Sequence, residues 1–473
     1  MAEKFYITTT TPYVNADPHI GFALEILQAD AIARYKRLCG YDVCFNWGTD
    51  EHGLKIYRKA LEQHKDPKIY CDEFAPRFKK LIATLNLSST NFIRTTDDYH
   101  VLAAQEFWKR CERNGDIYQK SYRSKYCVGC ELEKTDSELV DGRCPTHPSL
   151  ELEMIEEVNY FFRFSNYQQK LLTMYDNNPD FVVPQTRFNE LKSFVKAGLE
   201  DFSISRLKKK MPWGVPVPND PEQVMYVWFD ALVNYISTIG WPSDEKRFQT
   251  WWPVVQVAGK DNIRQQCAIW QAMLLSAGLP TSKQIFIHGF ITSAGQRMSK
   301  TTGNVISPFD LVKKYGLDPV RYYLLREIPS YDDGDYSDRR FKELYNANLA
   351  NGLGNLVARV AKLATHSSFN IHHSTFSEIN TGVYKKALEE YRFNDALAAV
   401  WEKIKATDKY IDENEPWKLT GDALTKVLKQ AINRILEIAT LLQPFLPQTA
   451  EKILVQFSTQ PIQPQPPLFP RLT

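Results

Sequence analysis

The beginning of the chain alternates between strand-like and helix-like spacing of hydrophobic residues. Residues 4–9 are typical of a strand, and after a polar loop the apolar positions repeat at helical spacing until Gly40, which can end a helix. A second strand-like run, residues 42–47, leads into the polar segment 48–53. This order predicts a parallel βαβ unit with functional groups after the carboxyl ends of its strands. The apolar positions of the predicted helix are Leu24, Leu27, Ala31, Tyr35 and Leu38.

A similar pattern returns much later in the chain. Residues 254–257 are strand-like, residues 262–276 have helical spacing, and residues 284–288 are again strand-like. The two stretches predict two halves of one parallel sheet, which an insertion separates. We therefore expect an α/β fold.

The last part of the chain has a different pattern. Residues 346–363, 384–413 and 424–442 are long amphipathic helical stretches with few strand signals. They predict an all-α bundle at the end of the fold.

The composition is that of a multidomain globular protein. A chain of 473 residues exceeds what one hydrophobic core supports, and we expect about two to four domains. A hydrophobic content of 43% and a charged content of 24% are ordinary for such proteins. The net charge of +2 is nearly neutral, so a nucleic-acid partner has to be met by local basic patches such as residues 208–210. The N-terminal residues do not form a secretory signal and no apolar run is long enough for a membrane span, so we expect a cytoplasmic location and no membrane contact.

The cysteines fall into two groups. The pattern Cys127-x2-Cys130-x13-Cys144-x2-His147 has the paired spacing of a tetrahedral zinc site, and its four protein ligands favour a structural site over a catalytic one. Unligated thiols or a disulfide are the alternatives. We expect the other five cysteines to be reduced, buried thiols: Cys39, Cys44, Cys71, Cys111 and Cys267.

Two short motifs suggest nucleotide chemistry. His19-Ile20-Gly21-Phe22 stands at the predicted helix start, where backbone N–H groups and the helix dipole favour phosphate. The segment 295–304 places Arg297 and Lys300 in a glycine-flanked loop that could neutralise a leaving pyrophosphate. Alone, the first could be a capping histidine and the second a solvated loop. No Walker-type glycine-rich segment is present.

Taken together, the two motifs resemble the His-Ile-Gly-His and Lys-Met-Ser-Lys-Ser signatures of class I aminoacyl-tRNA synthetases. Within that class the chain is similar to the methionyl-tRNA synthetase family over essentially its whole length. The stretches that carry this resemblance are residues 49–53, the Cys/His cluster, and residues 159–162, 201–206, 226–231, 259–261 and 412–417.

The resemblance implies activation of methionine by ATP, as methionyl-adenylate, followed by transfer to the methionine tRNA. It implies Mg²⁺ with ATP and one structural Zn²⁺ per chain. No appended tRNA-binding domain follows the bundle, so we expect a monomer. The implied domains are a Rossmann-type catalytic domain in two halves (1–115 and 226–292), a connective insertion with a zinc knuckle (116–225), a signature-loop region (293–345) and a helical anticodon-binding domain (346–473).

The resemblance also implies roles for individual residues. Asp50 pairs with the α-amino group of the substrate, and His19, Lys300 and Arg206 act near the reacting groups. The residues implied at ATP are His19, Gly21, Phe22, Glu25, Asp261, His288, Gly289, Arg297, Met298, Ser299 and Lys300. The amino-acid pocket is implied at Thr10, Thr11, Tyr13, Asp50, Trp228, Ala231, Leu232, Tyr235, Asn262 and Gln266, and anticodon binding at Asn355, Arg359 and Trp417.

Several positions depart from the family pattern. Phe22 replaces the second histidine of the first signature, which removes a hydrogen-bond donor to ATP. Asn262 and Gln266 stand where the family usually has Ile and His, and Thr10 and Thr11 stand where apolar residues are common. These departures leave two further hypotheses open, namely a paralogue that activates a different amino acid and a tRNA-binding protein without catalysis.

Overall fold

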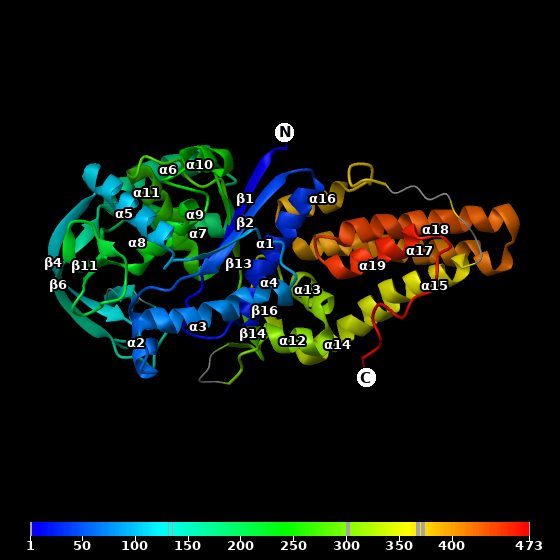
Figure 1. Cartoon of the computed structure of the whole chain (residues 1–473), viewed down its shortest axis with the longest axis horizontal. Helices are drawn as coiled ribbons and strands as arrows, with labels where there is room; N and C mark the ends of the chain where they lie inside the picture. The colour runs from blue at the N-terminus through cyan, green and yellow to red at the C-terminus, as the bar shows by residue number, and fades with distance from the viewer. Residues whose placement is uncertain are drawn as a thin grey trace.

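The computed structural model describes residues 2–130, 132–134, 136–298, 303–365, 369 and 374–472. Three residues of the second signature, Ser299, Lys300 and Thr301, lie outside this described part. The molecule is elongated, with the sheet and its insertions toward one end and the C-terminal helices toward the other (Figure 1).

The centre of the fold is a six-stranded parallel sheet with the order β3-β2-β1-β12-β13-β7. The N-terminal strand lies in the middle, with the strands of the first half on one side and those of the second half on the other. The predicted split sheet is therefore confirmed. The strands are β1 (Lys4–Thr9), β2 (Asp42–Thr49), β3 (Asn91–Arg94), β7 (Val182–Val183), β12 (Val255–Gly259) and β13 (Gln284–His288).

Side chains of successive strand residues enter two separate hydrophobic cores. In β1, Phe5 and Ile7 belong to one core and Tyr6 to the other, and in β13, Phe286 faces the first core while Ile287 faces the second. A parallel sheet covered on both faces has hydrophobic runs instead of alternation, because side chains of either direction are buried. This explains why apolar residues follow one another at residues 5–7 of β1 and 285–287 of β13, where alternation with polar residues would mark a strand with one exposed face.

Helices of the first half cover the sheet and begin or end at recognisable residues. His19 caps α1, and Gly40, with φ of +88°, follows its end, as predicted. Cys39 at this end is exposed, so the prediction that it is buried is wrong; the helix terminus turns it toward solvent. The helices are α1 (Ile20–Leu38), α2 (Leu54–Glu62), α3 (Pro67–Lys79), α4 (Leu81–Thr84) and α5 (Asp98–Arg113).

The insertion contains an antiparallel sheet with the order β5-β4-β6-β8 and a smaller one with the order β10-β11-β9. The predicted insertion, residues 116–225, also contains β7, which pairs in parallel with β13 and so belongs to the central sheet. The elements are β4 (Ile117–Cys127), β5 (Leu132–Lys134), β6 (Glu153–Phe162), α6 (Gln168–Asn177), α7 (Gln185–Lys196), β8 (Phe202–Ser203), β9 (Ser205–Leu207), β10 (Pro216–Val217) and β11 (Asp220–Met225).

The second half of the sheet domain contains a widened helix. The helix predicted at residues 262–276 is π-helical over Gln265–Ile269 before it continues as α11 (Trp270–Ser276). Such bulges are common at functional sites. The neighbouring elements are α8 (Val227–Ala231), α9 (Asn234–Ser237), α10 (Glu245–Trp251), β14 (Ile291–Ser293), β15 (Gln296–Arg297), α12 (Pro308–Tyr315), α13 (Leu317–Arg326), β16 (Gly334–Tyr336) and α14 (Asp338–Leu344).

The C-terminal part is the predicted helical bundle. A π-helical segment, Tyr345–Gly354, precedes α15 (Asn355–Ala364), and the stretch 384–413 is divided into α16 (Gly382–Glu389) and α17 (Phe393–Asn414). The predicted helical stretch is interrupted at this point, because Tyr391 adopts φ of +57°, through which an α-helix cannot continue. The bundle ends with α18 (Gly421–Leu442) and α19 (Pro447–Ser458).

A fully buried arginine joins the bundle to the sheet domain. Arg321 of α13 pairs with Asp30 of α1 at 2.8 Å and donates to the backbone carbonyls of Pro444 and Phe445, between α18 and α19. A buried guanidinium with its donors satisfied in this way fixes the position of both domains.

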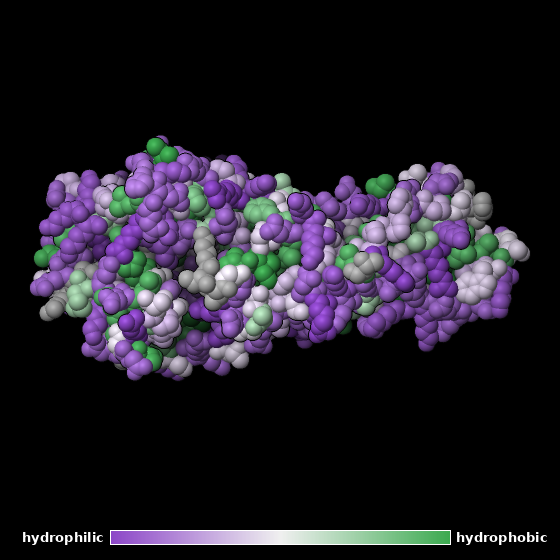
Figure 2. All heavy atoms as spheres, turned by 90° about the horizontal axis from the view of Figure 1, so that it is seen from below, coloured by the Kyte–Doolittle hydropathy of each residue, from purple (hydrophilic) through white to green (hydrophobic). Residues whose placement is uncertain are grey.

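On the face that Figure 2 shows, hydrophobic side chains occur in small groups among hydrophilic ones. Within the described ranges, no helix combines the length and apolar character that a bilayer crossing requires. Cys44, Cys71, Cys111 and Cys267 are buried free thiols, as predicted.

Candidate active site

The start of α1 brings the first motif to the carboxyl end of β1. The imidazole Nδ1 of His19 accepts a hydrogen bond from the backbone N–H of Gly21 at 3.0 Å. A Cβ atom at position 21 would lie 2.8 Å from the His19 ring, so a larger residue here would displace the imidazole. The ring of the adjacent Phe22 packs against Trp47 and Phe78, at centroid distances of 5.8 and 6.1 Å. Phe22 therefore fills core space beside the site.

Glu25, one helical turn further on, joins the two halves of the sheet. Its carboxylate accepts from the backbone N–H and hydroxyl of Thr10 at 2.8 and 2.6 Å. It also accepts from the backbone N–H of Gly259 at 3.1 Å, and it pairs with the imidazole of His288 at 3.0 Å. Burial opposes a charge on His288, but the hydrogen bond and charge of Glu25 raise the pKa of the imidazole above its usual value.

Two glycines, Gly259 and Gly289, stand at positions near these groups where a side chain would collide with neighbouring atoms. A Cβ atom at Gly259 would lie 2.9 Å from the carboxylate of Asp261, and one at Gly289 would lie 2.2 Å from the backbone of Asp332. Asp261, two residues after Gly259, is exposed, and the amide of Asn262 donates a hydrogen bond to it at 3.1 Å.

The second signature begins near Phe290, the residue that follows Gly289. The guanidinium of Arg297 lies 4.2 Å from the centre of the Phe290 ring, and Met298 packs partly against the core that contains α1. The expected roles of Ser299 and Lys300 concern residues outside the described part of the chain.

The residues that we expect at the amino acid lie near the end of β2. Asp50 is 3% exposed and forms a parallel bridge with Tyr13. The indole N–H of Trp228 donates to the Tyr13 hydroxyl at 3.3 Å, and the ammonium of Lys55 lies 4.8 Å from the centre of the Tyr13 ring. The structure thus brings the predicted carboxylate and two of the predicted aromatic residues together.

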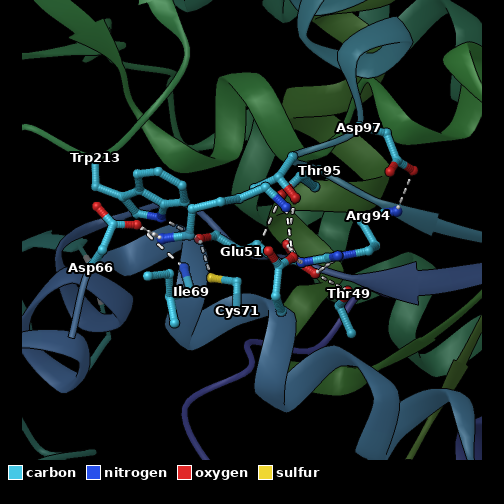
Figure 3. Close-up of polar contacts among 12 residues, drawn as sticks. Thr49, Glu51, Asp66, Ile69, Cys71, Arg94, Thr95, Asp97 and Trp213 are labelled. Atoms are coloured by element: carbon cyan, nitrogen blue, oxygen red, sulfur yellow. Dashed lines mark hydrogen bonds and ion pairs between the residues drawn. The ribbon is translucent and has the colours of Figure 1, made fainter. Parts of the chain in front are cut away.

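Glu51 holds the loop that carries Asp50 (Figure 3). Its buried carboxylate binds the guanidinium of Arg94 at 2.6 and 2.8 Å and accepts from Thr49 and Thr96 at 2.7 and 2.6 Å. Its backbone carbonyl accepts from the indole N–H of Trp213 at 2.5 Å. Both ends of this residue are therefore fixed. Sequence reasoning missed Arg94, because it lies 43 positions away and nothing local marks it.

A buried aspartate holds the residue that follows Glu51. Asp230 is fully buried and bonds His52 at 2.6 Å and His100 at 2.7 Å. Burial raises the pKa of Asp230, but the two histidines outweigh it and lower this pKa to about 2. The charged carboxylate therefore fixes His52 beside Asp50. The sequence signal that could have identified Asp230 was its position as an aspartate within the otherwise apolar run of residues 226–231.

The remaining predicted pocket residues approach from α8, α9 and the π-helical segment. The hydroxyl of Tyr235 accepts from the Gln266 amide at 2.8 Å, and both residues are buried. Ala231 and Leu232 are each 6% exposed, and Thr11 is half-buried. Of this set, the structure connects Gln266 to Tyr235, whereas Asn262 turns toward Asp261.

Arg206 lies in a separate cavity of about 260 Å³ between α2 and the insertion. Its guanidinium donates to the hydroxyl of Ser203 and the carbonyl of Ser205, both at 2.7 Å, and lies 4.7 Å from the centre of the Tyr226 ring. The Tyr226 ring is in turn 5.8 Å from that of Trp228. Arg206 is therefore connected to Trp228, one of the predicted pocket residues, through the ring of Tyr226.

The Cys/His cluster has the geometry of a metal site. The ligand atoms of Cys127, Cys130, Cys144 and His147 all lie within 4.8 Å of one another. Cys130 Sγ is 3.5 Å from Cys144 Sγ and 3.2 Å from His147 Nδ1. Tetrahedral zinc with Zn–S bonds of about 2.3 Å requires sulfur atoms about 3.8 Å apart, so the donor set fits. The knuckle also contacts the site, because Lys55 donates to the Gly129 carbonyl at 2.9 Å.

The three predicted anticodon residues lie near one another on the helical domain. The guanidinium of Arg359 is 5.2 Å from the centre of the Trp417 ring, and it pairs with Asp412 at 2.5 Å. Trp417 is 50% exposed, and Asn355, one turn before Arg359 on α15, is exposed too. An exposed indole beside a guanidinium and an amide suits an unpaired base.

Comparison with known families agrees with this arrangement. A family model described as "tRNA synthetases class I (M)" matches residues 5–153 and 149–361. A second model, described as "Anticodon-binding domain of tRNA ligase", matches residues 375–468.

Relatives and solved structures match nearly the whole chain. The methionine–tRNA ligase of Thermotoga maritima is 41% identical over 97% of this chain and 76% of its own length. That of Thermosynechococcus vestitus is 42% identical over 96% of this chain and 90% of its own length. The Mycobacterium tuberculosis methionyl-tRNA synthetase in complex with methionyl-adenylate is 37% identical, with a TM-score of 0.91 over 99% of this chain and 100% of that one. Its apo form has a TM-score of 0.84 at 34% identity, over 100% of this chain and 99% of that one. The chain therefore belongs to the methionyl-tRNA synthetase family of class I aminoacyl-tRNA synthetases.

Proposed function

We propose that this protein activates methionine with ATP and transfers it to the methionine tRNA. The observation that carries the proposal is the joining of two half-sites at the carboxyl ends of neighbouring strands. One half-site is the N-terminus of α1, which suits phosphate, together with the pair of Glu25 and His288. The other half-site is the buried carboxylate of Asp50 together with Tyr13 and Trp228. Likeness to a structure that holds methionyl-adenylate supports the same function.

On the nucleotide side, the first turn of α1 offers backbone N–H groups to the phosphates. Asp261 suits the ribose hydroxyls, and His288 with Gly289 borders the nucleotide. Arg297, with Lys300 and Ser299 of the second signature, would neutralise charge that develops on the pyrophosphate. Mg²⁺, when bound with ATP, supplies further neutralisation of phosphate charge.

On the amino-acid side, Asp50 suits the α-ammonium group, and the surrounding aromatic rings suit a polarisable thioether. Held in line, the substrate carboxylate oxygen attacks the α-phosphorus, and the bond to the bridging oxygen breaks so that pyrophosphate leaves with the electron pair. A ribose hydroxyl of the tRNA end then attacks the activated carbonyl carbon, loses its proton, and AMP leaves.

The knuckle residues Cys127, Cys130, Cys144 and His147 would hold one Zn²⁺ as a structural ion. Asn355, Arg359 and Trp417 would read the methionine anticodon. A monomeric state and a cytoplasmic location stay predictions from the sequence, and sedimentation and cell fractionation would check them.

The experiment that tests the function is amino-acid-dependent exchange between ATP and labelled pyrophosphate, across the standard amino acids and homocysteine. Exchange with methionine, and its loss in Asp50→Asn, supports the proposal. Exchange with another amino acid instead would indicate the specialised paralogue, and no exchange with any amino acid would indicate a tRNA-binding protein. Charging of methionine tRNA then tests the second step.

A further inference from the structure

The segment that carries Arg297 begins with a tight hairpin. β14 and β15 pair antiparallel, with Thr292 opposite Arg297, and the two residues between the strands, Ala294 and Gly295, have φ of +54° and +73°. Positive φ at both central residues is typical of a type I′ turn, which favours Asn, Asp or Gly. Alanine has no polar side chain that could stabilise this conformation, so the turn needs support from another part of the chain.

Asp335 of β16 supplies this support. Its Oδ1 atom accepts from the backbone N–H of Gly295 at 2.9 Å and from the hydroxyl of Thr292 at 2.6 Å. The Thr292 hydroxyl also lies 3.1 Å from the carbonyl of Gly334, its more distant acceptor. β16 runs parallel to β14, and Thr292 lies directly opposite Asp335. One carboxylate oxygen, 40 positions after the turn, therefore binds both the turn and the strand that precedes it.

A row of three paired residues connects Asp335 to Arg297. Residues directly opposite one another on neighbouring strands point their side chains to the same face of a sheet, so Asp335, Thr292 and Arg297 share one face. The guanidinium of Arg297 correspondingly lies 4.2 Å from the ring centre of Phe290, two positions before Thr292. A displacement of Thr292 or of the turn would therefore move Arg297.

A second carboxylate of the same segment fixes the ring that Arg297 contacts. Asp333 accepts from the backbone N–H of Phe290 at 2.8 Å and binds Lys260 at 2.7 Å. The ammonium of Lys260 lies 4.6 Å from the centre of the Phe290 ring, so this ring contacts two cations. Lys260 directly precedes Asp261, which we expect at the ribose. The hairpin is in this way joined to the nucleotide side of the site.

We propose that Asp335 is a positioning residue for the nucleotide step, which holds the β14–β15 hairpin so that Arg297 can reach the phosphates of ATP. The inference rests on the proposed function, in which Arg297 neutralises charge on the pyrophosphate. A carboxylate repels phosphate, so Asp335 contributes through the geometry that it imposes and not through its charge. Asp50 follows β2 and Trp228 lies on α8, so binding of methionine should not depend on Asp335.

Asp335→Ala tests this inference in pyrophosphate exchange. We expect kcat/KM for ATP to fall about three- to tenfold, the range that one neutral hydrogen bond contributes, because solvent weakens the bonds to an exposed carboxylate. KM for methionine, measured at saturating ATP, should remain that of wild type. An unchanged kcat/KM for ATP, or an equal effect on ATP and methionine, would overturn the proposal.

Asp335→Asn is the conservative variant. Its amide oxygen can accept both hydrogen bonds although the charge is lost, so it should recover most of the kcat/KM for ATP that Asp335→Ala loses. A value as low as that of Asp335→Ala would show that the charge of Asp335 acts instead of its hydrogen bonds, which contradicts a positioning role.

Thr292→Val removes one of the two donors and allows a double-mutant cycle. Alone, it should lower kcat/KM for ATP in the same direction as Asp335→Ala. Added to Asp335→Ala, it should lower this value no further, because both substitutions break the same hydrogen bond. A second fall as large as that of Thr292→Val alone would overturn the proposal. If Asp335→Ala does not fold, Thr292→Val carries the test, and wild-type kinetics for ATP in this variant would overturn it too.

Asp338→Ala is the matched control. Asp338 lies three positions after Asp335 and is exposed like it, but it accepts from Lys314 at 2.9 Å and from the hydroxyl of Tyr315, outside the hairpin. Asp338→Ala should leave kcat/KM for ATP unchanged, and a fall equal to that of Asp335→Ala would overturn the proposal. Wild-type protein that exchanges with no amino acid would overturn the proposed function itself, and this result is obtained before any variant is made.

Discussion

The guanidinium of Arg94 binds both carboxylate oxygens of Glu51. This ion pair connects β3 to the residues that directly follow β2, among them Asp50. Glu51 has a fully buried side chain, whereas Asp72, the second partner of Arg94, is half-exposed. A bidentate pair of this kind is strong and geometrically specific. The pair therefore sets the position of the proposed ammonium ligand without touching the substrate.

We predict that Glu51→Gln raises KM for methionine more than it lowers kcat, because Asp50 loses its rigid support. The loss of charge-assisted bonds should also lower the free energy of unfolding by about 1.5–3 kcal/mol. Pyrophosphate exchange kinetics and urea denaturation measure the two effects. Asp72→Asn is the control, since it alters the same guanidinium from its exposed side and should cost less than about 1 kcal/mol. Equal effects of the two substitutions would contradict this account.

What the sequence could predict was local. The strand and helix at residues 4–38 and the knuckle at residues 127–147 are read from neighbouring residues, because spacing along the chain directly sets their geometry. The two signatures indicated the synthetase class, and the further matching stretches indicated the family and with it the roles expected of Asp50 and Tyr13. In each case the information lies within a few turns of chain.

What the sequence could not predict depends on distant partners. Glu51 and Arg94 meet only after β2 and β3 pair, and the Tyr235 hydroxyl meets the amide of Gln266, 31 positions later, only in the folded chain. The break in the helix predicted at 384–413 has no glycine or proline to mark it, since Tyr391 itself takes the left-handed conformation. Tertiary packing overrides local preference at such positions.

The zinc knuckle gives a second prediction. A Cβ atom at Gly129 would lie 2.5 Å from the His147 ring, so Gly129→Ala should displace that ligand while all four ligands remain in the chain. We expect zinc affinity to fall about 10- to 100-fold, as for other changes that disturb ligand orientation. Competition with a chelator, read by metal analysis, measures this.

Gly142→Ala provides the comparison within the same knuckle. Its φ of +73° makes alanine strained there, but an added Cβ meets no atom within 4 Å. It should lose a little stability and keep its zinc. If Gly129→Ala holds zinc as tightly as wild type, the assignment of His147 as a ligand is wrong.

A third prediction concerns pH. The pKa of His288 is raised by Glu25, and Asp261 adds to this. A raised pKa in the folded state means that the stabilisation is complete below the unfolded value of about 6.5 and is lost as pH rises through the folded pKa. Wild type should therefore lose stability to urea and bind ATP more weakly as pH rises above neutrality. In His288→Gln both losses should be smaller over the same range. The same decline in both proteins would contradict the Glu25–His288 pair as its cause.

The last prediction separates anticodon reading from chemistry. Trp417 lies in the helical domain, distinct from the sheet domain that carries Asp50 and Glu25, and its ring is half-exposed beside Arg359. Stacking of one base on an aromatic ring contributes about 1–3 kcal/mol. Trp417→Ala should therefore raise KM for methionine tRNA about 5- to 150-fold and leave pyrophosphate exchange without tRNA unchanged.

Two further variants make this prediction specific. Trp417→Phe keeps a ring for stacking and should recover part of the lost affinity, because stacking needs a π-face and not the indole N–H. Lys405→Ala removes an exposed charge on α17 of the same domain and should change KM for tRNA little. A fall in exchange that accompanies the loss of charging in Trp417→Ala would mean that Trp417 supports the fold and not a base. An unchanged KM in Trp417→Ala would remove it from the anticodon site and leave Asn355 and Arg359 to be tested alone.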